Sequence, residues 1–287
     1  MMPSPVRLVV APPGAWLQRA TAMVLAVTVA ASAAVAIADE VRPSAIVAFD
    51  RYVDATEARM RADRQDGHLL WIDRLPEARR SPLERRLAAG DIVTERLTSY
   101  DGSAPIAVSD AIFLHALASV QLHDVTVGEV MALLLDVDHH AEIFAPTIRR
   151  SRTVGHEGDA VIVAGQFSHR NVVTITYNAE VETRCASLSA TQAECRSVSR
   201  RGAMVADAGR PTEREKPFRG DARKQWFLRT YYRLEARGDG TRVEHETLFV
   251  CPPLARLLRI FTPLVRNVPA EVSEALLAGM HARLSPH

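Results

Sequence analysis

Six consecutive segments between residues 147 and 250 have the alternating apolar pattern of β-strands, and an amphipathic helical segment follows them. The predicted strands are Thr147–Val154, Ala160–His169, Val172–Arg184, Cys195–Val205, Gln225–Ala236 and Arg242–Val250. Over Ala270–Leu284 the apolar residues Val272, Leu276 and Met280 lie on one helical stripe, which must be buried. This order predicts an α+β fold in which a curved antiparallel sheet wraps around a long C-terminal helix.

Residues 39–110 predict a separate N-terminal extension of two helices, Ile46–Arg64 and Pro76–Ala89, and a strand over Asp91–Tyr100. The extension is too small to bury a core alone, so we expect it to pack on a main domain at 111–287. That domain begins with a strand at Ile112–Leu122. A helix follows at Thr126, where Glu129 has capping-box spacing.

The first 38 residues have the order of a secretory signal peptide. Arg7 and Arg19 precede an apolar run over residues 20–38 that ends in Ala36-Ile37-Ala38, and small residues at these two alanines suit cleavage before Asp39. We therefore expect an exported protein, periplasmic or extracellular. The alternative is a retained membrane anchor, because about 19 apolar residues are just enough to span a bilayer.

Charge and motifs exclude several classes of function. The chain of 287 residues has 35 basic and 34 acidic side chains, so it lacks the positive field of a nucleic-acid-binding protein. It contains no GxSxG, P-loop, dinucleotide-binding or HExxH motif. Asp136, Asp138, His139, His140 and Glu142 gather near a helix end, where such residues usually form a solvated cap. We expect no metal and no cofactor.

The three cysteines are compatible with export. Cys185 and Cys195 are separated by nine residues and flank a turn between two predicted strands, so a disulfide across this hairpin is one reading and three unpaired thiols are the other. Cys251 has no partner if the disulfide forms.

The order of elements resembles the START-like superfamily, also called SRPBCC or polyketide-cyclase-like. The resemblance covers about residues 111–284. Within it, Val127–Arg152 has the family's order of a helix, a short helix, a proline and the start of a strand. Phe49–Met60, Trp71–Leu75 and Glu213–Pro217 also resemble a group of exported bacterial proteins of this fold. The resemblance implies a helix-grip fold with a deep cavity between sheet and C-terminal helix, which usually holds a lipid, quinone, polyketide or other apolar molecule.

Strand alternation indicates which side chains face such a cavity. His169 shares a face with Val161, Val163 and Phe167, and Tyr177 lies on the apolar face of the next strand. On the last hairpin, alternation separates an inward face from charged residues that point away. The expected ligand-binding residues are His169, Tyr177, Trp226, Tyr232, His245 and Phe249.

From these observations we expect an exported protein that binds a hydrophobic or amphipathic small molecule, more as a carrier than as an enzyme. A cyclase- or hydrolase-like enzyme with a cavity histidine as general acid or base is the alternative. A structural protein whose cavity is filled by its own side chains is the third reading. We expect a monomer that binds no nucleic acid and has transient contact with a membrane.

Overall fold

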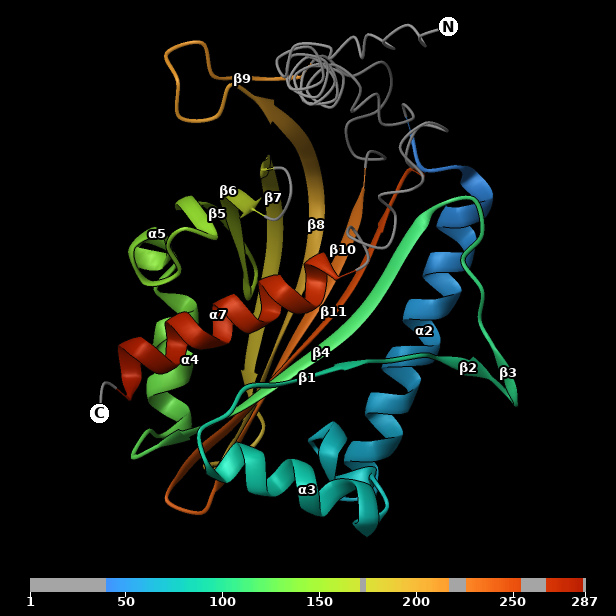
Figure 1. The fold of residues 1–287 in the computed structure, drawn as a ribbon, viewed down its shortest axis with the longest axis vertical. Coiled ribbons are helices and arrows are strands. Elements are labelled where there is room, and N and C mark those ends of the chain that lie inside the picture. The colour runs from blue at the N-terminus through green and yellow to red at the C-terminus, as the bar shows by residue number, and fades with distance from the viewer. Residues whose placement is uncertain (1–39, 171–173, 217–225, 254–266, 286–287) are drawn as a thin grey trace, which may run out of the picture.

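The computed structural model describes residues 40–170, 174–216, 226–253 and 267–285. Its centre is a curved antiparallel sheet in the order β1-β4-β11-β10-β8-β7-β6-β5, with β9 paired to β8 (Figure 1). The strands are β1 Val93–Arg96, β4 Ile112–His123, β5 Ile148–Glu157, β6 Ala160–Arg170, β7 Thr174–Ser187, β8 Gln192–Ala206, β9 Arg214–Glu215, β10 Phe227–Arg237 and β11 Gly240–Cys251. A small hairpin, β2 Tyr100–Asp101 and β3 Ala104–Pro105, stands apart from this sheet.

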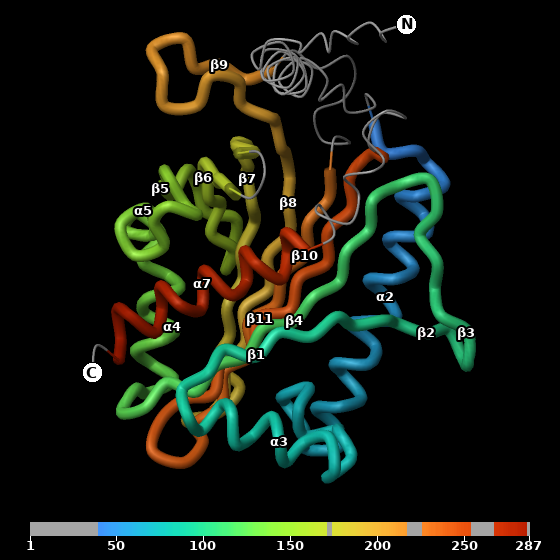
Figure 2. Tube along the Cα trace, in the orientation of Figure 1, coloured from blue at the N-terminus to red at the C-terminus, as the bar shows by residue number. Residues whose placement is uncertain are grey.

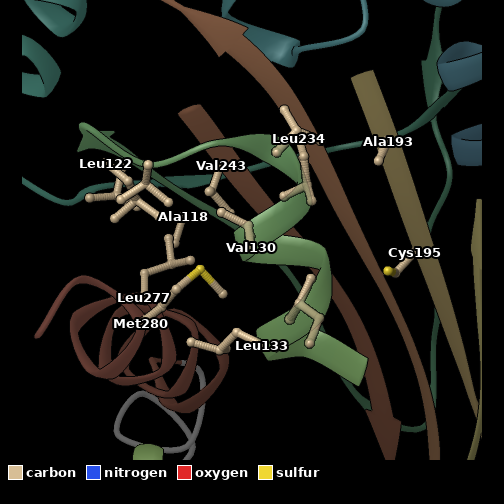
Figure 3. Packing of buried hydrophobic residues seen from close by; sticks show 14 of the residues in the cluster. Ala118, Leu122, Val130, Leu133, Ala193, Cys195, Leu234, Val243, Leu277 and Met280 are labelled. Carbon is tan, nitrogen blue, oxygen red and sulfur yellow. The ribbon is translucent and has the colours of Figure 1, made fainter. Parts of the chain in front are cut away.

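Helix α7, Val268–Leu284, runs across the inner face of the sheet (Figure 1). Its C-terminal half contributes Leu277 and Met280 to a packed core with α4, Val127–Leu135, and with strands β4, β10 and β11 (Figure 3). The short helices η2, Val137–His139, and α5, His140–Ile143, follow α4. Gly279 lets α5 approach α7, because a Cβ there would lie 2.8 Å from the Ile143 carbonyl oxygen.

The N-terminal elements cover the outer face of the same sheet. Helix α2, Pro43–Gln65, buries Phe49, Tyr52 and Val53 against outer-face residues of β10 and β11. The helix η1, Trp71–Arg74, and helix α3, Glu77–Ala88, form a second apolar cluster that includes Leu117 of β4. Both views of the chain place α2 and α3 away from α7 (Figures 1 and 2). No helix in the described ranges is long and apolar enough to cross a membrane.

The predicted α+β fold, with a helix-gripping antiparallel sheet and an N-terminal helical extension, is confirmed. The capping box at Thr126 is present, since its hydroxyl accepts from the Glu129 N–H while the Glu129 carboxylate accepts from the Thr126 N–H. Two details differ. The strand expected over Asp91–Tyr100 shrinks to β1, and β1 pairs with β4, so an edge of the main sheet comes from the extension. The predicted signal peptide and its cleavage site lie outside the described residues.

Candidate functional site

A cavity of about 290 Å³ lies between the sheet and the N-terminal half of α7. Val268, Val272 and Leu276 of α7 close one side of the cavity, and η2, α5 and the end of α4 close another. Because Leu277 and Met280, further along α7, pack directly on the sheet, the space exists only beneath the first half of this helix. The volume is near the lower end of small-molecule pockets, about 300–1,000 Å³.

All six residues expected at the site line this cavity. An aromatic group forms part of its wall: the rings of Tyr177 and Trp226 lie 5.4 Å apart at 70°, and those of Trp226 and Phe249 lie 5.9 Å apart. Trp226 sits directly over Gly202 of β8, where any side chain would collide with the indole ring. The sequence alternation placed these side chains on the inner face; contact with a ligand stays a prediction.

His245 and Tyr232 form a second group on paired strands. The two residues face each other across β10 and β11, and their rings stack with centroids 4.3 Å apart. Burial lowers the pKa of His245 to about 3, and Nδ1 of this imidazole has no hydrogen-bond partner among the described residues. Burial also raises the pKa of Tyr232. Both side chains are therefore neutral at physiological pH.

His169 differs from His245 because it has a carboxylate partner. Its Nε2 lies 2.9 Å from Oε2 of Glu271 in the first turn of α7, although the geometry of this contact is not that of a hydrogen bond. Glu271 is 39% exposed, which places the pair at the edge of the cavity and not in its depth. A histidine with a nearby carboxylate is the arrangement that a general base requires.

A row of hydroxyl side chains crosses the cavity wall and was not recognised in the sequence. Strand pairing aligns Thr183 with Ser197, Ser197 with Thr230, and Thr230 with Thr247. All four side chains line the cavity, and we call them the hydroxyl row. The Oγ atoms of Thr183 and Ser197 lie 2.9 Å apart, and Thr247 Oγ1 lies 3.4 Å from the Ser273 Oγ on α7. The row follows from the register of four strands, which alternation within one strand does not reveal.

The two cysteines that were candidates for a disulfide lie opposite each other in the sheet. Cys185 and Cys195 form a disulfide between facing positions of β7 and β8 and line the cavity. Cys251 is a free thiol whose pKa is raised to about 12 by burial.

Side chains of the group near the end of α4, which includes Asp136, Asp138 and His139, bind to partners close by. The imidazole of His139 bonds Asp136, and Asp138 accepts from the Thr153 N–H. Among the described residues no cluster of three or more histidine, cysteine or acidic side chains is arranged to hold a metal ion.

No family model and no curated protein matches the chain. Among solved structures, the chain is similar to the human StarD13 lipid transfer and protein localization domain at 10% identity and a TM-score of 0.45, over 74% of this chain and 99% of that one. It is similar to a STAR-related lipid transfer protein from Xanthomonas axonopodis at 12% identity and a TM-score of 0.41, over 59% and 85% of the two chains.

The chain is also similar to the Zhui aromatase/cyclase from Streptomyces sp. R1128, at 12% identity and a TM-score of 0.35, over 61% of this chain and 98% of that one. At these identities the likeness concerns the fold alone.

Proposed function

We propose that this protein is an exported carrier that takes a hydrophobic or amphipathic small molecule into the cavity between the sheet and α7. The observation that carries the proposal is the lining itself, which is mostly aliphatic and aromatic with a few hydroxyl and imidazole groups. Burial of a ligand's carbon surface there contributes roughly 25 cal/mol per Å². A small number of polar groups in an apolar wall is how such pockets fix a ligand's orientation.

The test is to purify the protein from the cells that make it and to weigh it by native mass spectrometry, before and after extraction with organic solvent. We expect a bound lipophilic species that extraction removes. Protein that carries no lipophilic species from these cells would count against the carrier.

Export is part of this proposal and has its own measurement. Edman sequencing of protein recovered from the cell envelope or medium is expected to begin at Asp39, since Ala36 and Ala38 suit the signal peptidase. A mature chain that retains residues 20–38 would indicate the membrane-anchored alternative. We also propose that the carrier is a monomer and that it does not bind nucleic acid.

The His169–Glu271 pair favours a second candidate, a cyclase- or hydrolase-like enzyme in which His169 acts as general base. An activated ester with an apolar acyl chain, p-nitrophenyl hexanoate, is a suitable probe. For an enzyme, saturable hydrolysis falls at least tenfold in His169→Gln and stays unchanged in the control Thr94→Val, which alters an exposed residue of β1 outside the cavity lining. For the carrier, hydrolysis does not exceed that of free imidazole in either variant.

A further inference from the structure

The polarity of the cavity carries more information than its size. None of the described residues that line it is aspartate, glutamate, lysine or arginine. The polar side-chain atoms of its described lining belong to hydroxyl groups, imidazoles, the Trp226 indole and sulfur. A charged ligand group that moves from water into the cavity loses its hydration and gains no ionic partner there. An unpaired buried charge is strongly unfavourable.

The histidines of the lining do not supply a positive charge in the depth of the cavity. Burial lowers the pKa of His140 as well as that of His245, and Nε2 of His140 lies 3.0 Å from the Leu133 carbonyl oxygen, to which it donates. The side chains of His169 and Glu271 lie at the edge, where each group already faces the other. No anion-binding or cation-binding group of the described chain therefore reaches the hydroxyl row.

The hydroxyl row is the part of the wall that is equipped to bind oxygen atoms. Each hydroxyl donates one hydrogen bond and accepts up to two, so Thr183 and Ser197 keep bonding capacity beyond their mutual contact. Thr230 lies in the middle of the row, paired with Ser197 on one side and with Thr247 on the other. Tyr232 and His245 form the next pair on the same face of β10 and β11, two residues along from Thr230 and Thr247, and they extend the polar surface.

We infer that the cavity selects an uncharged amphiphile, whose hydroxyl or carbonyl oxygens bind along Thr183, Ser197, Thr230 and Thr247, and that it rejects the carboxylate and ammonium counterparts of that ligand. This inference rests on the proposed carrier function, because it assumes that the cavity is occupied. It assigns the recognition of the ligand to neutral hydrogen bonds, while the apolar wall holds the carbon skeleton.

Three probes with the same alkyl chain and different head groups test it: 1-dodecanol, dodecanoate and dodecyltrimethylammonium, each below its micelle concentration at pH 7.5. Each probe displaces the neutral fluorophore N-phenyl-1-naphthylamine from the full-length protein. We expect 1-dodecanol to displace it with at least tenfold higher affinity than either ion. Equal or tighter binding of dodecanoate or of the ammonium probe would overturn the inference while leaving the carrier function intact.

Two variants locate the preference on the row. Thr230→Val keeps the shape of the side chain and removes its hydroxyl, so we expect a three- to tenfold loss of 1-dodecanol affinity with the fluorophore still bound. Thr94→Val makes the same change at an exposed position of β1, outside the cavity lining, and is expected to change nothing. Thr247→Val repeats the test if Thr230→Val fails to fold.

Loss of 1-dodecanol affinity in Thr94→Val and not in Thr230→Val or Thr247→Val would contradict the assignment to the row. A wild-type protein that binds neither the fluorophore nor any probe would instead overturn the carrier function, and the inference with it.

Discussion

At the scale of single residues, His245 connects the chemistry of the cavity to the stability of the protein. Its imidazole is 3% exposed and stacks on Tyr232, in surroundings that keep it neutral. The folded protein therefore resists protonation of this residue, whereas the unfolded chain protonates it near its ordinary pKa of 6.5. Protons then favour the unfolded chain as the pH falls below 6.5.

We predict that His245 makes the protein less stable in mild acid. Between pH 6.5 and 5 the unfolded state alone gains this proton, at about 1.4 kcal/mol per pH unit, or about 2 kcal/mol in total. The loss continues until the folded pKa of about 3 is reached. Urea unfolding at pH 7 and pH 5 measures it, and the difference between the two is expected to shrink by about 2 kcal/mol in His245→Phe, which keeps an aromatic ring against Tyr232. Equal pH differences in the two proteins would refute the prediction.

Gly202 is the second residue on which the cavity depends. A Cβ at this position would lie 1.8 Å from the Trp226 ring, so the ring has to move before any side chain fits. We predict that Gly202→Ala lowers the free energy of unfolding by about 1–3 kcal/mol, the range for an overpacked site, and weakens binding of N-phenyl-1-naphthylamine. Gly155→Ala is the matched control, because its Cβ meets nothing within 4 Å on β5. Urea unfolding and fluorophore binding are measured on both variants. Equal free energies of unfolding and equal affinities in the two variants would show that the position of Trp226 does not depend on Gly202.

At the scale of elements, the contact between α2 and the outer face of the sheet contains a buried ionic network. Glu246 of β11 is fully buried and forms ion pairs with Arg59 of α2 and Arg233 of β10. His115 of β4 lies 2.8 Å from Glu246 through Nε2 and bonds the Tyr52 hydroxyl of α2 through Nδ1. One carboxylate therefore holds the helix and three strands together.

The protonation states in this network follow from its surroundings. Burial opposes ionisation of Glu246, but the two guanidinium groups outweigh it and lower its pKa. Burial lowers the pKa of His115, which is neutral. Since the Tyr52 hydroxyl accepts from the Ser99 N–H, it donates to Nδ1, and the His115 Nε2–H donates to Glu246.

We predict that Glu246→Gln destabilises the protein by about 3–5 kcal/mol, because it leaves Arg233 and Arg59 buried without their common carboxylate. The control is Glu95→Gln, which removes an ion pair with Arg79 at a more exposed site and is expected to cost about 1 kcal/mol or less. Chemical denaturation of the two variants gives the comparison. A cost for Glu246→Gln as small as that of the control would show that the network contributes little.

The strands of the sheet show which features of the fold the sequence could predict and which it could not. Period-two alternation predicted the inner face of β6, β7, β10 and β11, because one strand contains that information. It also assigned Arg233, Glu244 and Glu246 to the opposite face, where the structure has them, but it did not show that α2 and η1 bury them. Arg59 and His115, which bind Glu246, and the η1 N–H groups that bind Glu244 lie more than a hundred residues away along the chain. Likewise, the hydroxyl row exists only once four strands are in register.

At the scale of the whole molecule, the sheet has two different partners on its two faces. On the inner face, α7 and α4 form a packed core at one end and leave the cavity at the other. On the outer face, α2, η1 and α3 cover apolar and charged side chains. Residues 40–110 therefore pack as one body with the sheet, to which they also contribute β1.

This arrangement predicts that residues 111–287 do not form a stable domain without residues 39–110. Removing the extension exposes Tyr231, Leu248 and Val250 from the apolar cluster under α2, takes Arg59 from Glu246, and takes the two backbone N–H groups of η1 from Glu244. An apolar patch and two carboxylates that keep Arg233 but have lost their partners in the extension then face solvent, which favours aggregation. We expect the truncated chain to be insoluble, or to unfold without a cooperative transition, whereas residues 39–287 unfold cooperatively.

Cooperative urea unfolding of the truncated chain, with the near-ultraviolet circular dichroism of the longer one, would contradict this. Adding residues 39–110 as a separate chain distinguishes a missing surface from a broken fold. If the extension acts by covering the outer face, the two pieces recover soluble, cooperative protein together. Failure to recover it would mean that the covalent link from α3 through β1 to β4 is also needed, because it brings the extension to the sheet at a low entropic cost.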